Sequence, residues 1–582
     1  MDFLSLVIDG RKVQVPKGVT VLEAAKSLDI NIPALCISPG FAISGFCRSC
    51  VVEVGEGGDL SPACVLPVQE NLHIKTNSPK VIASRRLTAE LTVARHSMEC
   101  AICYRNGKCD LQRLADTYGI KESRFFTREQ PLEIDDDSPA IVHNPNRCIL
   151  CGLCVQACCD IQTVSVIDFA YRGFERVVEP AFGQSLNEVE CVACGQCIQA
   201  CPVESFYEKS DIDWVLEVLR NPGQVTVAYL SPPVAISLGE EFGLGVERPL
   251  TGEIVKALKM AGFQKVFDAA LGADLVILEE AYELLTRLNS GKKLPLMTSC
   301  SPEWVKFIEH FYPELLPHLC PTKSPQQIMG TLVKTHLAKA LGIDPKEIFT
   351  VSITPCTAEK FERTRPELAS SGHPDVDACL TIKEAARLIR MTSGGSFPHL
   401  GAEEFDEPFE TASGAGTLFG AAGGVMEGVL RTFYELKTGK RLKSVGFDNL
   451  RGEVGTSPAG GLREAEVPVG NEVLKVAIVH GLGNARRVLD SLRSGDKKYH
   501  FVEVKGCPNG CSQGGGQPLP TTPELVRTRE RALYAEDEKK KVRKAHENPR
   551  VKELYEKLLK KPGSPIAKKL LHTEFTPRKH YL

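Results

Sequence analysis

Alternating apolar and polar positions define the start of the chain. Residues 3–16 (FLSLVIDGRKVQVP) alternate on both sides of Asp9-Gly10, a dipeptide typical of hairpin turns, and so predict two short strands. A helix is expected over the following VTVLEAAKSL, capped by Thr20 or by the glycine before it. The segment 1–78 is therefore predicted to be a small domain that begins with a β-hairpin.

Other periodicities divide the remaining chain into four segments. Residues 79–125 are typical of helix with a polar, cysteine-bearing middle, and residues 138–209 contain two similar halves about 43 residues apart. Across 210–520, apolar strands (QVTVAYL, KVFDAAL, IFTVSIT and LKVAIVH) alternate with amphipathic helices, which predicts an α/β domain. The tail 521–582 is helical and charge-rich, and we interpret its charge run as a solvated helix face.

The cysteine content changes this picture more than the rest of the composition does. The net charge of −3 gives no indication of a nucleic-acid or anionic-membrane partner. No apolar run approaches the roughly 18 residues of a membrane span and the N-terminus lacks a signal-peptide pattern, so we expect a cytoplasmic protein with no membrane span. In such a protein 22 cysteines indicate metal ligation, and fifteen of them lie in four spaced groups between Cys36 and Cys201.

The first group has the spacing C-x10-C-x2-C-x13-C after the β-rich start, which suits a [2Fe–2S] cluster in a small ferredoxin-like domain. Four thiolates also hold structural zinc, so zinc stays open as an alternative, although the neighbouring groups are not zinc-like. The predicted ligands are Cys36, Cys47, Cys50 and Cys64.

The second group has the spacing H-x3-C-x2-C-x5-C, which allows one imidazole and three thiolates to hold a [4Fe–4S] cluster. A neutral histidine in place of a thiolate should raise the potential of that cluster, because it makes the cluster less negative. The predicted ligands are His96, Cys100, Cys103 and Cys109.

The third and fourth groups are two runs of C-x2-C-x2-C-x3-C, the pattern of bacterial ferredoxins with two [4Fe–4S] clusters. In that pattern the fourth cysteine of each run ligates the other cluster, and we read the adjacent Cys159 as a bystander. The predicted ligands are Cys148, Cys151, Cys154, Cys158, Cys191, Cys194, Cys197 and Cys201. One [2Fe–2S] and three [4Fe–4S] clusters in sequence predict an electron-transfer chain.

Three later motifs carry a family resemblance. They are Thr298-Ser299-Cys300-Ser301-Pro302-Glu303-Trp304, Pro355-Cys356-Thr357-Ala358 and Cys507-Pro508-Asn509-Gly510-Cys511. With the order of the four cluster groups and the tail RALYAEDEKKKVRKAHENPRVKELY, they resemble the iron-only ([FeFe]) hydrogenases over essentially the whole chain. The first half alone would also fit the iron–sulfur subunit of respiratory NADH dehydrogenase.

This resemblance implies a multidomain α+β fold. The expected order is a β-grasp [2Fe–2S] ferredoxin-like domain (1–78), a [4Fe–4S] segment with one histidine and three cysteine ligands (79–125), a two-cluster [4Fe–4S] ferredoxin domain (138–209), a two-lobed α/β iron-hydrogenase large-subunit-like domain (210–520) and a small-subunit-like segment (521–582). It also implies a catalytic centre, the H-cluster, in which a [4Fe–4S] cube is joined through one cysteine to a two-iron unit.

The resemblance implies roles at that centre. Cys356, Cys507 and Cys511 match ligands of the cube, and Cys511 matches the one that bridges to the two-iron unit. Cys300 matches the cysteine that passes protons, and Glu280 and Glu283 match the acidic residues of the proton path to solvent.

The chain departs from the family pattern at this site. Ser301 stands where the fourth cube ligand is a cysteine, and an alkoxide is a harder and more basic ligand than a thiolate. Glu359 replaces a lysine that donates a hydrogen bond to a cyanide of the cluster. An ionised Glu359 has only acceptors to offer to the cyanide, which is itself an acceptor, so Glu359 would have to be protonated to take this role. The side chain of the adjacent Lys360 starts from a different direction. Lys505 replaces a methionine. Two further departures are Pro233, at a cyanide-binding serine position, and Cys320, at a serine position of the proton path, where a thiol is tolerable.

Two functional interpretations follow. In the first, the protein is a divergent hydrogenase that interconverts H2 with protons and electrons and holds a modified H-cluster. In the second, it is an electron-transfer subunit of a larger NAD(P)H or ferredoxin oxidoreductase complex, with a remodelled site or a remnant [4Fe–4S] cube. Because the Gly-rich stretches lack a nucleotide fingerprint, we expect the partner to be ferredoxin or a separate flavin- or NAD-binding subunit. A cluster-assembly or sensor protein remains a third, less favoured class.

Overall fold

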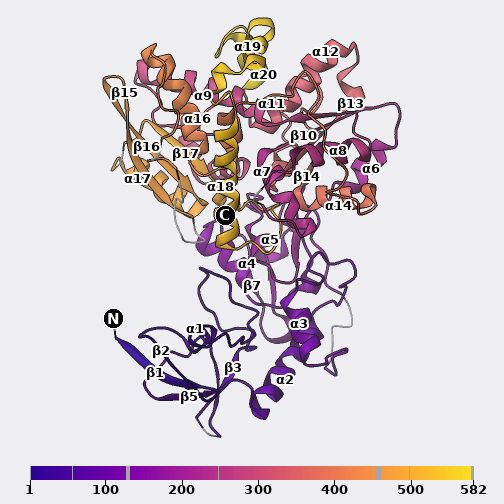
Figure 1. The fold of residues 1–582 in the computed structure, drawn as a ribbon, viewed down its shortest axis with the longest axis vertical. Coiled ribbons are helices and arrows are strands. Elements are labelled where there is room, and N and C mark those ends of the chain that lie inside the picture. Colours follow the sequence, from indigo (N-terminus) through magenta and orange to yellow (C-terminus); the bar gives the residue numbers. More distant parts are fainter. Residues whose placement is uncertain are drawn as a thin grey trace.

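The computed structural model describes residues 2–55, 57–125, 131–246, 248–447, 449–451, 460–496 and 498–578. Figure 1 shows the parts stacked along the long axis of the molecule: the N-terminal sheet at one end, the cysteine-rich segments next, and two sheet-containing lobes at the other end. Within the described residues, no helix combines the length and apolarity needed to cross a membrane.

The N-terminal part is one five-stranded sheet, ordered β2-β1-β5-β3-β4, with a short helix. Its elements are β1 (Phe3–Ile8), β2 (Arg11–Pro16), α1 (Val21–Lys26), β3 (Val51–Val54), β4 (Leu60–Pro62) and β5 (Leu72–Lys75). The predicted hairpin is confirmed, because β1 and β2 pair antiparallel around Asp9 and Gly10, which both have positive φ as a tight hairpin turn requires. Thr20 caps α1 in a capping box with Glu23, also as predicted.

Two helices lead away from this sheet, α2 (Pro79–Arg95) and α3 (Asp110–Thr117). The guanidinium of Arg85 on α2 donates to the Val51 carbonyl at 2.7 and 3.1 Å, which fixes α2 against β3. The expected ligands of the second cluster group lie between the end of α2 and the start of α3.

The cysteine-rich middle contains two two-stranded sheets and two short helices: β6 (Ile141–His143), α4 (Leu153–Gln156), β7 (Asp168–Ala170), β8 (Val177–Glu179), α5 (Gln196–Ala200) and β9 (Phe206–Glu208). The internal repeat is confirmed by α4 and α5, which each start after a left-handed glycine inside a C-x2-C pair, Gly152 (φ +79°) and Gly195 (φ +69°). β6 pairs with β9, which joins the start of this segment to its end, and β7 pairs with β8 in the connection between the two cysteine runs.

The first lobe is built on an all-parallel sheet, ordered β11-β10-β13-β14. Its elements are α6 (Ile212–Leu219), β10 (Val225–Leu230), α7 (Pro232–Ser237), α8 (Thr251–Ala261), β11 (Lys265–Asp268), β13 (Ile348–Thr354), α13 (Ala358–Glu362), β14 (Ala378–Thr381) and α14 (Ile382–Ser393). β13 is buried along its whole length, as a central parallel strand covered by helices should be.

The second lobe is built on a sheet ordered β12-β17-β16-β15, in which only β15 runs antiparallel. Its elements are β12 (Leu296–Met297), β15 (Leu462–Val469), β16 (Glu472–His480), α17 (Leu482–Ser494), β17 (Phe501–Lys505) and β18 (Pro508–Cys511). The helices that pack between and around the two sheets are α9 (Ala270–Ser290), α10 (Pro302–Phe311), α11 (Pro325–Leu332), α12 (Ala338–Leu341), α15 (Gly414–Thr417) and α16 (Gly424–Thr438).

The C-terminal segment wraps the lobes with α18 (Pro523–Lys539), α19 (Pro549–Leu554) and α20 (Pro565–Leu571), drawn in yellow in Figure 1. Our interpretation of its charge run as a solvated helix face holds for only part of α18, where Arg531, Glu538 and Lys539 are exposed but other charged residues are buried. Asp537 is fully buried and accepts from the Arg431 guanidinium at 2.8 Å, and Arg529 is buried against Glu240 at 2.8 Å. Charges along this helix pair with charges on other elements, which a sequence pattern cannot show.

Candidate active site

The four thiols of the first group converge in pairs beside the N-terminal sheet. Cys36, Cys50 and Cys64 are buried, and the Cys47 amide donates to Cys36 Sγ. Interaction with Cys36 lowers the pKa of Cys47 to about 5, and interaction with Cys64 lowers the pKa of Cys50 to about 7. Thiols this close, with one of each pair poised to ionise, form a suitable ligand set for a metal cluster.

The geometry of the second group favours His96 as a ligand. Its Nδ1 lies 2.7 Å from the carbonyl oxygen of Arg147, so Nδ1 carries the proton and Nε2 keeps its lone pair. Metal-binding histidines are typically oriented in this way by a carbonyl on the other ring nitrogen. Burial also lowers the pKa of His96, which favours the neutral ring that a metal requires.

The two ferredoxin-like runs exchange their fourth cysteines. One small cavity is lined by Cys148, Cys151, Cys154 and Cys201, so the last cysteine of the second run joins the first three of the first run. In the other set, Cys158 lies close enough to Cys194 and Cys197 to raise their pKa values, after the larger effect of burial. Cys159 lies outside both sets, since its thiol donates to the Ile167 carbonyl at 3.6 Å.

Apolar packing connects neighbouring groups. Cys36 and Cys47 pack in one buried cluster with Cys151, and Cys109 packs in another with Cys201 and Cys47. A third cluster packs Cys148 and Cys154 with Cys158, Cys191 and Cys197, so thiols of all four predicted accessory centres are connected by apolar packing.

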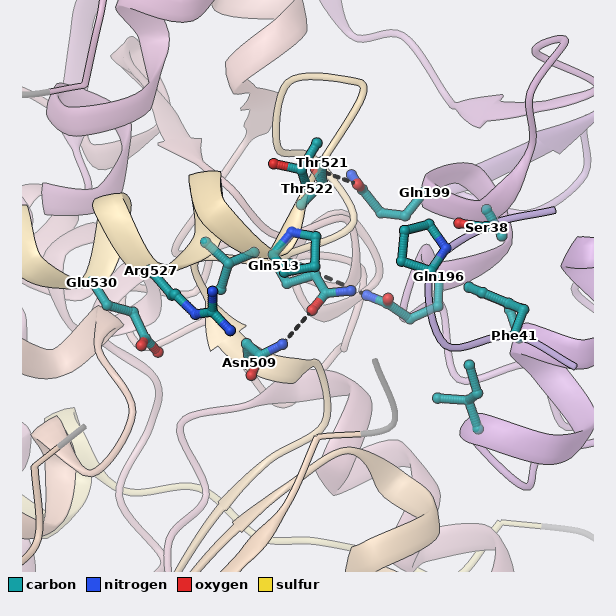
Figure 2. A pocket seen from close by; sticks show the side chains of 16 residues that line it. Ser38, Phe41, Gln196, Gln199, Asn509, Gln513, Thr521, Thr522, Arg527 and Glu530 are labelled. Carbon is teal, nitrogen blue, oxygen red and sulfur yellow. Dashed lines mark hydrogen bonds between the residues drawn. The ribbon is translucent and has the colours of Figure 1, made fainter. Parts of the chain in front are cut away.

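The cysteine-rich middle docks directly on the lobes. Figure 2 shows the pocket at this junction, where the amides of Gln196 and Gln199 on α5 face Gln513 and Thr521 across it. Gln196 Nε2 donates to the Gln513 carbonyl at 3.1 Å, and the Thr521 hydroxyl donates to Gln199 Oε1 at 2.9 Å. These bonds fix the second ferredoxin-like set against the loop that follows β18.

The backbone of the cysteine-rich middle approaches that of the lobes even more closely beside Cys194. The Thr357 hydroxyl donates to the Ala193 carbonyl at 2.8 Å, and a Cβ on Gly195 would lie 2.8 Å from the Cα of Gly515. Burial, Glu303 and Cys194 together raise the pKa of Cys507. The second ferredoxin-like set thus adjoins the cysteines of the later motifs.

The later motifs meet because they follow parallel strands. The segment Thr298–Ser301 follows β12, Cys356 follows β13, Cys507 and Cys511 follow β17, and Pro233 follows β10. Loops at the carboxyl ends of parallel strands form the binding site in α/β folds, and here two sheets present such loops to each other. We call this group of residues the terminal site.

Glu303 is the acidic residue of the terminal site that our sequence reasoning missed. The Cys356 and Cys507 thiols donate to its two carboxyl oxygens at 3.8 and 3.7 Å, and the Ser301 hydroxyl donates to Oε1 at 2.6 Å. The sequence did contain an indication of this role, because Glu303 is the acidic residue of the motif Thr298–Trp304. Ser301 itself also accepts from the Gly506 amide at 3.2 Å.

Glu359 and Lys360 point in different directions. Burial, followed by the neighbouring Glu362, raises the pKa of Glu359 to about 8, so its carboxyl group is protonated at neutral pH and offers a donor. The Lys360 ammonium is fully buried elsewhere, 2.5 Å from the Cys379 carbonyl and 2.9 Å from Glu384. Lys360 therefore does not substitute for the absent lysine.

Lys505 contacts the cysteine that the resemblance assigns to proton transfer. Its ammonium donates to Cys300 Sγ at 3.6 Å and to the Phe419 carbonyl at 3.0 Å. Burial acts to lower the pKa of Lys505, but Cys300, Cys511 and the surrounding carboxylates outweigh it and raise the pKa. Pro233 offers no donor and packs beside Gly420, where a Cβ would lie 2.4 Å from its ring.

The remaining predicted residues lie near Cys300 and near one another, since Glu280 is close to Cys300 and to Cys320, and Glu283 is close to Cys320. Glu280 is fully buried, and neither carboxyl oxygen has a hydrogen-bond partner among the described residues. Burial and then Glu280 raise the pKa of Cys320, whose thiol lies 3.2 Å from the Thr322 hydroxyl. Glu283, one turn along α9, is partly exposed and pairs with Arg287 at 2.7 Å.

Comparison with known proteins identifies the lobes. Residues 224–515 match the family model "Iron only hydrogenase large subunit, C-terminal domain", and residues 523–578 match "Iron hydrogenase small subunit". The NADP-reducing hydrogenase subunit HndD of Solidesulfovibrio fructosivorans is 42% identical over 590 residues, covering 99% of this chain and 100% of that protein. The chain belongs to the iron-only hydrogenase family.

Further comparisons extend this result to both halves of the chain. Iron hydrogenase 1 of Clostridium pasteurianum is 35% identical over 578 residues, covering 98% of this chain and 99% of that protein. A solved structure of [FeFe]-hydrogenase HydA1 from Chlamydomonas reinhardtii has 34% identity and a TM-score of 0.55, covering 63% of this chain and 99% of that chain. The protein is thus an oxidoreductase of the iron-only hydrogenase type, divergent at its active-site motifs.

Three more family models match the N-terminal half. They are "2Fe-2S iron-sulfur cluster binding domain" (residues 2–79), "NADH-ubiquinone oxidoreductase-G iron-sulfur binding region" (85–124) and "4Fe-4S dicluster domain" (147–205). The protein therefore carries iron–sulfur cofactors that include [2Fe–2S] and [4Fe–4S] clusters. The second match also bears out the likeness of this half to the NADH dehydrogenase subunit.

The side chains of the terminal site fit an iron–sulfur cube. Cys356, Cys507 and Cys511 are mutually close enough for the latter two to raise the pKa of Cys356, after burial and the nearby carboxylates. Three thiols with oxygen donors beside them match the ligand preference of iron–sulfur clusters.

Proposed function

We propose that this chain interconverts H2 with two protons and two electrons at the terminal site and relays the electrons through its row of iron–sulfur clusters to a redox partner. One observation carries the proposal: Cys507 lies close to Cys194 of the Cys158/Cys191/Cys194/Cys197 set, and Cys511 lies close to Cys300, which adjoins Glu280. Electrons and protons from one reaction thereby have separate exits.

The cofactors of the relay are one [2Fe–2S] and three [4Fe–4S] clusters, about 14 iron atoms in all. Their ligands are Cys36, Cys47, Cys50 and Cys64; His96, Cys100, Cys103 and Cys109; Cys148, Cys151, Cys154 and Cys201; and Cys191, Cys194, Cys197 and Cys158. The convergence of thiols in the Cys36/Cys47 pair and in the Cys148/Cys151/Cys154/Cys201 set supports this assignment.

The chain is organised in the five predicted domains, 1–78, 79–125, 138–209, 210–520 and 521–582, which the extents of the family-model matches support. The mixed five-stranded sheet of the first domain supports a β-grasp ferredoxin-like fold.

At the terminal site, Cys356, Cys507 and Cys511 would hold a [4Fe–4S] cube, and the cube with its two-iron unit would supply the chemistry that activates H2. The chain's own residues handle the protons. Cys300 Sγ receives a proton, Glu280 holds it in a buried site where burial raises the pKa of the carboxyl group to about 8, and Cys320 and Glu283 pass it toward solvent. Glu359, protonated at neutral pH, and the ammonium of Lys505 supply donors to the bound group.

The redox partner is a nicotinamide-reducing assembly of separate flavin- or NAD-binding subunits, or ferredoxin, in the cytoplasm. The name of one relative, an NADP-reducing hydrogenase subunit, supports this class of partner.

A second candidate function is that of an electron-transfer subunit whose terminal site does not turn over H2. The contact of Lys505 with Cys300 favours it, because a cation 3.6 Å from Sγ favours the thiolate over the thiol and so opposes the uptake of a proton by Sγ.

An assay of H2-dependent dye reduction distinguishes the two functions. The protein is matured with the family's assembly factors, and the reduction of a viologen dye under H2 is measured. The first function predicts turnover that Cys300→Ala lowers about 100-fold, while the absorption of the accessory clusters stays unchanged. Absence of turnover in wild type with full accessory clusters would establish the electron-transfer function instead.

A further inference from the structure

The carboxylate of Glu303 lies in the space that the terminal cysteines enclose. Its Oε2 is 3.8 Å from Cys356 Sγ and its Oε1 is 3.7 Å from Cys507 Sγ, and the residue is only 3% exposed. A buried carboxylate is costly unless it has partners that compensate its charge. The partners of this one are mainly groups that ligate metals.

The chain makes room for this side chain. A Cβ on Gly506 would lie 2.3 Å from Glu303 Cγ, so only a glycine at position 506 leaves space for the glutamate to enter. Glu303 also belongs to the first turn of α10, directly after Pro302, where the helix dipole stabilises a negative charge. Two independent features of the fold thus hold a carboxylate at this point.

The hydroxyl of Ser301 is less suited to bind a metal. It donates to Glu303 Oε1 at 2.6 Å and accepts from the Gly506 amide at 3.2 Å, so both its donor and one acceptor position are in use. To ligate iron as an anion it would have to lose a hydroxyl proton. A carboxylate is already an anionic oxygen ligand of the kind found in many iron sites.

The total charge of the ligand set also favours Glu303 over Ser301 as the fourth ligand. A carboxylate carries one negative charge, as the missing thiolate would, so three thiolates and one carboxylate give the cube the same total ligand charge as four thiolates. A neutral serine would leave the ligand set one negative charge short.

We propose that Glu303 is the fourth protein ligand of the terminal iron–sulfur centre, with Cys356, Cys507 and Cys511 as the other three. This inference rests on the proposed function only in assuming a cube at the terminal site. On binding, the two thiols that now donate to Glu303 release their protons to solvent, and each sulfur and one carboxyl oxygen bind iron instead.

The test compares three variants of the full-length protein after reconstitution with iron and sulfide. Glu303→Gln removes the charged ligand and keeps its size, and Ser301→Ala removes the competing oxygen. Glu362→Gln is the matched control, because Glu362 is a buried carboxylate that accepts from Ser324 and Gln326 and from no thiol among the described residues. Iron per chain and the electron paramagnetic resonance of oxidised protein are measured, since oxidised [2Fe–2S] and [4Fe–4S] clusters are silent and a three-iron cluster is not.

The proposal predicts that Glu303→Gln loses about one iron and gains a three-iron signal, while Ser301→Ala and Glu362→Gln match the wild type. Adding Ser301→Cys to Glu303→Gln should restore the iron and remove the signal, which excludes misfolding as the cause. A three-iron signal in Ser301→Ala with an unchanged Glu303→Gln would assign the ligand to Ser301 and overturn the proposal. A wild type with only about 14 irons would instead refute the cube itself, and with it this part of the proposed function.

Discussion

Glu280→Gln tests the buried proton-holding carboxyl group through the pH dependence of stability. Burial raises the pKa of Glu280 from 4.5 to about 8 in the folded protein. The folded state therefore keeps its proton between these values while the unfolded chain releases it, so the protein loses stability as pH rises through this window. Between pH 5 and pH 8 this linkage amounts to roughly 3 to 4 kcal/mol.

Glutamine carries no titrating proton, so the substitution removes this pH dependence. The thermal midpoint of the hydrogenase-type lobes should rise in Glu280→Gln relative to wild type by roughly 5 °C more at pH 8 than at pH 5. Glu283→Gln, one turn along α9, is the matched control: it breaks an ion pair with Arg287 at 2.7 Å and should lower the midpoint at both pH values. Scanning calorimetry at the two pH values measures both variants, and a difference between Glu280→Gln and wild type that does not grow with pH would refute the reasoning.

Three further sets of substitutions test separate parts of the site. His96→Cys replaces a neutral ligand by an anionic one and should lower the potential of one cluster by on the order of 100 mV in a redox titration; an unchanged potential would exclude His96 as a ligand. Lys505→Met removes the ammonium that donates to the bound group and should lower H2-dependent dye reduction about tenfold, whereas higher turnover would mean that the ammonium hinders proton uptake by Cys300. Cys201→Ser should damage the cluster held by Cys148, Cys151 and Cys154 and Cys158→Ser the other, seen as different signals lost from the reduced spectra; loss of the same signal from both would contradict the exchange of cysteines.

Much of this architecture could be predicted because short-range patterns determine it. The alternation around Asp9-Gly10 predicted the hairpin, the run IFTVSIT predicted the buried strand β13, and the C-x2-C spacings predicted the repeat that the glycine-led helices confirm. The resemblance of the three later motifs predicted the family of the two lobes from the sequence alone.

The chemistry of the terminal site could not be predicted to the same depth, because it depends on contacts between distant segments. Glu303 reaches the cysteines only through space that Gly506 leaves free, about 200 residues further along the chain. The contact of Lys505 with Cys300 joins segments that follow two different strands of one sheet. Asp537 in the C-terminal tail likewise owes its burial to Arg431 on α16.

The central claim, that the terminal site carries an H2-activating centre, is tested most directly by infrared spectroscopy of protein matured with the family's assembly factors. Bound carbon monoxide and cyanide absorb in an infrared window where protein is silent. An H2-activating centre at the terminal site should therefore give a set of bands in this window that shifts when H2 is added. If a protein with full accessory clusters shows no such bands, the terminal site does not carry an H2-activating centre, and the protein is an electron-transfer subunit.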